Sequence, residues 1–192
     1  MKSSDLLQQV EATSRAILKL AEEHFAPLSS EVLNYKPNAQ KWSIAECLEH
    51  LNYYSDYYNK EAQLAIEKAQ KKQWRAVPTF NSTWLGKKSI ESVHPNNTKP
   101  TQAVKTLNPS LSTVRPDVVQ RFIQGQKEFL QLIEAARHIN LNKAKVRIEV
   151  FKLLKLRLGD IFLFMIAHHQ RHCNQALRVG NFEATLLFKT VH

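Results

Sequence analysis

Apolar residues recur at helical spacing in four long stretches of the chain. These stretches cover Ser4 to Phe25, Ser43 to about Gln73, Pro116 to about His138, and Leu158 to Val179. In each of them the apolar positions lie three or four residues apart, which places them on one face of an α-helix. Four helices that each bury one face predict an all-α fold, a four-helix bundle.

Residue types at the ends of these stretches support the assignment. Ser43 can cap the second helix, and Glu46 can bond back to its amide, which is a capping box. Pro116 is expected at the first position of the third helix, where its missing N–H is tolerated. Gly180 follows the fourth helix, as glycine commonly does at a helix C-terminus.

The segments between the helices differ in length. Residues 76–115 contain four prolines and form a long connection between the second and third helices, of the kind that serves as a lid or an assembly arm. Residues 139–157 predict a loop with a short turn or strand, and the last twelve residues give no clear pattern. Without a shift in composition, the chain is expected to be one domain over residues 1–192.

The composition argues against some functions that the fold class alone would allow. The chain has only 4 glycines among 192 residues, and it contains neither a Rossmann glycine motif nor a phosphate-binding loop. Its formal net charge of +10 makes nucleic acid or another anionic partner worth considering. However, the basic residues are spread along the chain without a nucleic-acid-binding motif. We therefore expect a solvated basic surface rather than binding to nucleic acid.

Two further features bear on the protein's location. The longest uncharged apolar run, 161–167, is too short to span a bilayer, and residues 1–15 are too polar for a signal peptide. Cys47 and Cys173 lie within helical patterns, where cysteine usually behaves as a small buried hydrophobe. A cytoplasmic protein without membrane association is therefore expected.

A dense group of histidines lies in the fourth predicted helix, in "IAHHQRHCNQ" at residues 166–175. At about 100° per residue, His172 falls about 40° from His168, and Gln175 about 20° to the other side. These three side chains therefore lie at the centre of the apolar face, whereas His169 lies about 100° away, at its edge. An unpaired polar group buried there would cost about 1–3 kcal/mol.

A metal ion would satisfy two neighbouring imidazoles at once. Histidines at i and i+4 share one helix face, as in zinc-binding helices, and neutral imidazole is a good ligand for zinc, nickel, copper or iron. His50 on the second helix is the candidate third ligand. The residues alone also allow His50 to be a boundary histidine bonded to backbone, and the pair to be ordinary core histidines. Gln175 either bonds to backbone or fixes an imidazole.

Two segments resemble the DinB-like superfamily, which includes the bacillithiol-transferase-like enzymes. They are "KPNAQKWSIAECLEHL", with Trp-Ser entering a helix and His-Leu two turns later, and "HHQRHCNQALRV", with His-x-x-x-His followed three residues later by Gln. The resemblance implies a four-helix bundle with a metal site at His50, His168 and His172, and it aligns Gln175 with a motif glutamine. It assigns no role to His169, which we expect to support the ligands or line the pocket, and whose i, i+3 spacing with His172 also allows it as a substitute ligand. It also implies zinc or nickel as the metal and a homodimer.

Some members of this superfamily transfer low-molecular-weight thiols to electrophiles. Three histidines leave a metal position open, as in catalytic rather than structural sites. The leading hypothesis is therefore a metal-dependent thiol S-transferase acting on a small molecule, with Tyr57 and Glu61 lining its pocket. The alternatives are a metal-dependent hydrolase and a non-catalytic metal- or ligand-binding module in a stress response.

Overall fold

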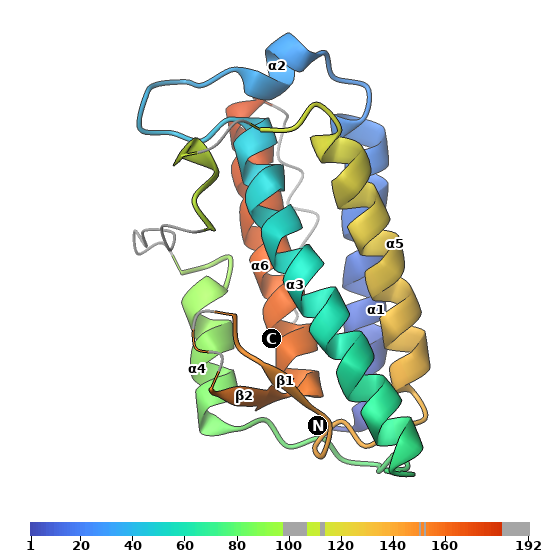
Figure 1. Cartoon of the computed structure of the whole chain (residues 1–192). Helices are drawn as coiled ribbons and strands as arrows, with labels where there is room; N and C mark the ends of the chain where they lie inside the picture. The colour runs from blue at the N-terminus through green and yellow to red at the C-terminus, as the bar shows by residue number, and fades with distance from the viewer. Residues whose placement is uncertain (98–106, 112–113, 150, 152, 182–192) are drawn as a thin grey trace.

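The four predicted helices form a bundle. A computed structural model describes residues 1–97, 107–111, 114–149, 151 and 153–181. The long helices are α1 (Ser3–Leu20), α3 (Ile44–Lys71), α5 (Val118–Ala136) and α6 (Leu158–Val179), as Figure 1 shows. The all-α fold predicted from the sequence is thereby confirmed. None of the helices in the described part of the chain is long and apolar enough to cross a membrane.

The direction of the helices explains the long connection between α3 and α5. Each of α3 and α1 packs against both α5 and α6. In Figure 1, α3 and α5 run from the top of the bundle to the bottom, whereas α1 and α6 run upward. Because α3 ends at the bottom and α5 begins at the top, the connection between them, residues 72–117, has to be long.

Shorter elements fill the connections. They are a π-helical turn η1 (Ala21–Phe25), α2 (Ser30–Asn34), α4 (Trp84–Val93), a 3-10 turn η3 (Pro109–Leu111), and strands β1 (Lys145–Arg147) and β2 (Lys155–Arg157). A loop with a short turn or strand was expected in residues 139–157, and the structure has two short strands there that pair antiparallel. However, the connection 76–115 was expected to be a loop, and it contains the ten-residue helix α4. Its residues 98–106 and 112–113, and the end of the chain at 182–192, lie outside the described part.

Most of the predicted helix ends are correct. The Ser43 hydroxyl accepts from the Glu46 N–H at 3.1 Å, and the Glu46 carboxylate accepts from the Ser43 N–H at 2.8 Å, so the capping box is present. Gly180 is the C-cap of α6. The prediction for Pro116 is wrong, because α5 begins at Val118. Pro116 lies in the preceding turn, where a fixed φ and a missing N–H are equally tolerated.

A layer of buried polar residues crosses the bundle between two apolar clusters. One cluster, near the hairpin, includes Phe129 and Phe162, and the other, near α2, includes Phe25 and Phe122. Between them lie fully or almost fully buried polar side chains, which we call the buried polar layer: Ser14, His50, Ser55, Gln126, His168 and His169. Cys47 and Cys173 are free and buried in the cluster near α2, as predicted.

Hydrogen bonds to the buried carboxylate of Asp160 connect the start of α4 to the start of α6. Asp160 is fully buried and accepts hydrogen bonds from the Ser82 hydroxyl and from the Thr83 N–H and hydroxyl. Thr83 caps α4 by accepting from the Gly86 N–H at 2.9 Å. A Cβ atom at Gly86 would overlap the Asp160 carboxylate, so the glycine allows α4 to approach α6 closely.

We therefore predict that Gly86→Ala lowers the free energy of unfolding by about 1–2 kcal/mol, because overpacking costs about 1–3 kcal/mol. In an exposed helix the same change would stabilise by up to about 1 kcal/mol. The sign of the effect, measured by urea unfolding, therefore tests the close approach. Lys87→Ala, at the exposed neighbouring position, is the control. A more stable Gly86→Ala variant would contradict the prediction.

Candidate metal centre

Three histidines from two helices converge within the bundle. His50 comes from α3, and His168 and His172 come from α6, one turn apart. One ring nitrogen of each lies within 4.8 Å of those of the other two, so the three are positioned to bind a metal ion. The Nε2 atoms of His50 and His168 are 3.2 Å apart. Two nitrogens at the usual zinc distance and a tetrahedral angle would be about 3.3 Å apart, which matches this separation.

Hydrogen bonds orient two of the three rings so that one nitrogen of each keeps a lone pair for a metal ion. His50 Nδ1 lies 2.7 Å from the Leu107 carbonyl oxygen, and His172 Nδ1 lies 2.9 Å from Gln175 Oε1. Both oxygens only accept, so both Nδ1 atoms carry the proton and both Nε2 atoms are free as ligands. Partners of this kind orient metal-binding histidines and raise their basicity.

The third ring has an unsatisfied nitrogen. His168 Nδ1 is buried and has no hydrogen-bond partner among the described residues. An unpaired buried polar atom costs about 1–3 kcal/mol. A metal ion bound at His168 Nε2 would leave this atom unpaired, so the case for a metal depends on the donor set. The donor set, three uncharged imidazoles without a carboxylate or thiolate, suits zinc, nickel, copper or iron.

Burial keeps the three imidazoles uncharged. Desolvation lowers the pKa of His50 to about 4 and the pKa of His172 to about 3. It also holds the pKa of His168 well below its usual value, and the neighbouring rings of His172 and His50 add to this effect. The neutral ring is the form that binds metal, so the ligands are ready at neutral pH.

Aromatic rings enclose the histidines. Trp42 stacks on His172 with ring centroids 5.6 Å apart, and Phe164 stacks on His168 at 5.6 Å. The Tyr54 ring lies 4.3 Å from that of His168. Burial raises the pKa of Tyr54 to about 12, so its hydroxyl stays protonated. These rings limit the access of water to His50 and His168, whereas His172 is partly exposed.

The expectation that His169 lies at the edge of the apolar face is wrong. Its side chain is fully buried on a different side of α6 from the three histidines. His169 Nδ1 lies 2.9 Å from Gln126 Nε2 on α5, and Nε2 lies 3.4 Å from the Ser55 hydroxyl on α3. These polar partners allow it to be buried. His169 thus belongs to the buried polar layer and not to the metal-ligand cluster of the described residues.

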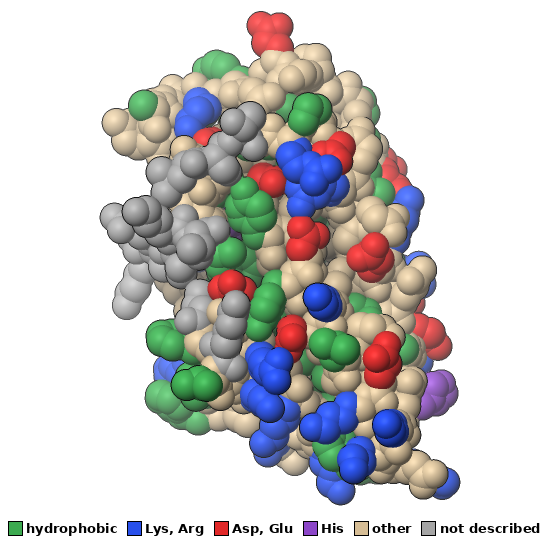
Figure 2. Space-filling model, in the orientation of Figure 1, with side chains coloured by type: hydrophobic (Ala, Val, Ile, Leu, Met, Phe, Trp, Pro, Cys, Tyr) green, Lys and Arg blue, Asp and Glu red, His purple; other side chains and the backbone are tan. Residues whose placement is uncertain are grey.

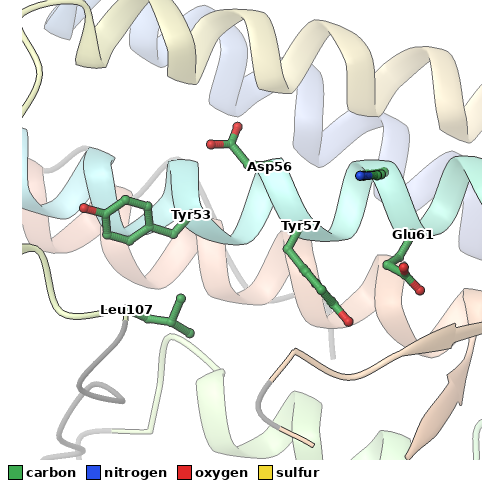
Figure 3. Close-up of a pocket in the computed structure, with 6 residues that line it drawn as sticks. Tyr53, Asp56, Tyr57, Glu61 and Leu107 are labelled. Carbon is green, nitrogen blue, oxygen red and sulfur yellow. The ribbon is translucent and has the colours of Figure 1, made fainter. Parts of the chain in front are cut away.

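Tyr57 and Glu61 line a groove rather than touching the histidines. The groove, of about 430 Å³, is also lined by Tyr53, Asp56, Lys60 and Leu107. In Figure 3 the side chains of Tyr57 and Glu61 project to the same side of α3, towards the hairpin, whereas Asp56 points away. Leu107 connects the groove with the histidines, because it lines the groove and its carbonyl bonds to His50.

The connection between α3 and α5 is held against the site at several points. The Arg171 guanidinium on α6 donates to the carbonyls of His94 and Asn97, just after α4. Ser110 donates to the Glu46 carboxylate at 2.9 Å. Leu107, which accepts from His50, lies between these anchors in sequence. Sequence patterns do not reveal it, because the functional atom is a backbone oxygen.

We predict that the metal-free protein loses stability as the pH falls below about 6.5, the pKa of histidine in an unfolded chain. Between pH 6.5 and about 4 the unfolded chain binds protons, whereas folded His50, His169 and His172, with pKa values of about 4, 3 and 3, do not. The free energy of unfolding should then fall by about 1 kcal/mol per pH unit for each of these histidines.

Urea unfolding between pH 7 and pH 5 measures this slope. His169→Gln can retain hydrogen bonding to Ser55 and Gln126, and it should reduce the slope by about one proton. His138→Gln, at an exposed position just after α5, is the matched control. Stability that does not change over this range would contradict the prediction.

Comparison with known proteins identifies the family. The family model of the DinB superfamily matches residues 13–176, which include all three histidines. No curated protein and no solved structure gives a significant match to the chain. The match covers most of the chain and agrees with the helical fold and the three-histidine cluster. The chain belongs to the DinB superfamily.

Proposed function

We propose that this protein is a metal-dependent enzyme that transfers a low-molecular-weight thiol to a small electrophile. His50, His168 and His172 would hold one divalent transition metal ion, zinc or nickel. The observation that carries the proposal is the convergence of three neutral imidazoles, two of which have the free Nε2 fixed by Leu107 and Gln175. Three protein ligands are typical of catalytic sites, which keep a position for an exchangeable ligand.

The surroundings of the three histidines support a catalytic rather than a structural role. A bound metal ion supplies an electrostatic field that lowers the pKa of a thiol or of water. Trp42, Tyr54 and Phe164 surround the rings and reduce the local polarity, which strengthens such a field. His172 is the most exposed of the three, so a small molecule would reach the metal ion from its side.

The choice of a thiol over water as the nucleophile is based on the family resemblance. A hydrolase would use the same three histidines, and a binding module would retain the metal without turnover. The basic chain, with a formal net charge of +10, is favourable to an anionic thiol. Homodimer formation and a cytoplasmic location remain predictions from the sequence.

We predict that protein purified without an affinity tag binds about one equivalent of zinc or nickel. His172→Ala should weaken the affinity by more than about 100-fold, and Gln175→Ala by about 10–100-fold, the usual effect of removing an outer-shell partner. His138→Ala removes an exposed histidine and should bind metal like the parent protein. Elemental analysis and competition with a chelator measure both quantities. If the chain bound no metal after loading with zinc or nickel, the proposal would fail.

We further predict that the loaded protein forms an adduct between a low-molecular-weight thiol and an electrophile such as a chlorinated arene or an epoxide. Removing the metal should abolish adduct formation, and adding it back should restore it. His172→Ala should reduce the rate by at least about 100-fold, because it removes a ligand of the site.

The product distinguishes the alternatives. A metal-dependent product of water attack would identify a hydrolase in place of a transferase. Metal retention without turnover of any thiol and electrophile pair would favour the binding module. Either result would overturn thiol transfer, and neither would affect the metal site.

A further inference from the structure

The hairpin formed by β1 and β2 exposes apolar side chains at its tip. Phe151 is 66% exposed, Leu153 98% and Leu154 46%. The described residues expose eight large apolar side chains, and three of these fall within four consecutive positions of this tip. Single exposed apolar residues are ordinary, but such a concentration on one turn indicates a surface for interaction.

The fold does not need apolar residues at the tip. The hairpin is anchored by Val146 and Leu156, which lie opposite one another and are buried in the apolar cluster near the hairpin. Beyond them the chain turns through a backbone hydrogen bond of 2.8 Å from the Leu154 N–H to the Phe151 carbonyl. Neither Phe151 nor Leu153 contributes to that core, so their exposure is not explained by folding.

Positive charge surrounds the tip. Residues 143–157 contain six basic residues and one acidic residue. Lys145, Arg147 and Lys155 point outward from the strands, and none of them forms an ion pair with a described residue. In Figure 2 the lower part of the visible face carries mostly Lys and Arg side chains, with apolar side chains at its left edge.

An exposed tryptophan lies on the helix that packs against β2. Trp84 is 74% exposed at the start of α4, which packs against β2. Lys87 and Lys88 follow it on the same helix and are also exposed. Tryptophan is enriched where proteins meet the interface between a membrane and water, because its ring is apolar with one polar edge.

We propose that the hairpin tip and Trp84 dock this protein on the surface of an anionic lipid bilayer. Phe151, Leu153 and Leu154 would insert at the boundary between headgroups and acyl chains, while Lys145, Arg147 and Lys155 contact the anionic headgroups. Binding of this kind combines buried apolar area with electrostatic attraction. The proposal is independent of the metal site.

The charge and composition of this surface favour lipid over other occupants. A second copy of the chain would bring a second basic hairpin against the first, and like charges oppose such pairing. Single-stranded nucleic acid is held by aromatic rings on which bases stack, whereas leucines dominate this tip.

Co-sedimentation of the full-length protein with vesicles tests the proposal. With vesicles of phosphatidylcholine containing about 30% phosphatidylglycerol in ~50 mM salt, the bound fraction should exceed that with pure phosphatidylcholine by at least about tenfold. The combined change Phe151→Ser and Leu153→Ser should reduce binding by at least about tenfold. Lys145→Gln with Lys155→Gln should reduce it by about fivefold for each lysine.

Leu64→Ser is the matched control, because Leu64 is 49% exposed on α3, away from the hairpin. It should bind vesicles like the parent protein, and circular dichroism should show that all variants are folded. The proposal is overturned if the parent protein does not bind anionic vesicles, or if the tip variant binds them undiminished. It is also overturned if light scattering shows a dimer that the tip variant dissociates while vesicle binding is absent, since the occupant would then be a second copy.

Discussion

Burying several imidazoles at mid-height in an apolar bundle is the constraint on which this structure depends. Each ring must be uncharged, and each nitrogen needs a partner. Burial lowers the pKa values far enough to keep the rings neutral. His169 obtains partners from Gln126 and Ser55, and His50 and His172 from Leu107 and Gln175. His168 Nδ1 has no partner among the described residues, and it is the convergence of the three neutral rings that points to a cation.

The path of the chain follows from the same constraint. Because α3 and α5 run in the same direction (Figure 1), the connection between them has to be long, and one of its residues, Leu107, reaches His50. The Leu107 carbonyl of this connection bonds to His50. Hydrogen bonds to Arg171 and to Asp160, both on α6, hold the connection in place. The connection between α3 and α5, which is long because of the helix directions, thus contributes to the site.

Much of the fold and the candidate ligand set can be predicted from the sequence. The four helices follow from apolar spacing, the start of α3 from the capping box, and the three histidines from the i, i+4 pair together with the family resemblance. The rest depends on contacts that have no sequence pattern. The Leu107 carbonyl is backbone, the burial of His169 depends on Gln126 from another helix, and α4 forms because Thr83 and Asp160 meet across 77 residues.

The central claim is that His50, His168 and His172 bind one metal ion and leave a position for an exchangeable ligand. X-ray absorption spectroscopy of the zinc- or nickel-loaded protein tests this claim directly. We expect the scattering of three imidazoles at about 2.0–2.1 Å for zinc, falling to two in His172→Ala. Adding a thiol should introduce one sulfur at about 2.3 Å while the three imidazoles remain. A spectrum with fewer than three imidazoles in the parent protein, or one that His172→Ala leaves unchanged, would contradict it.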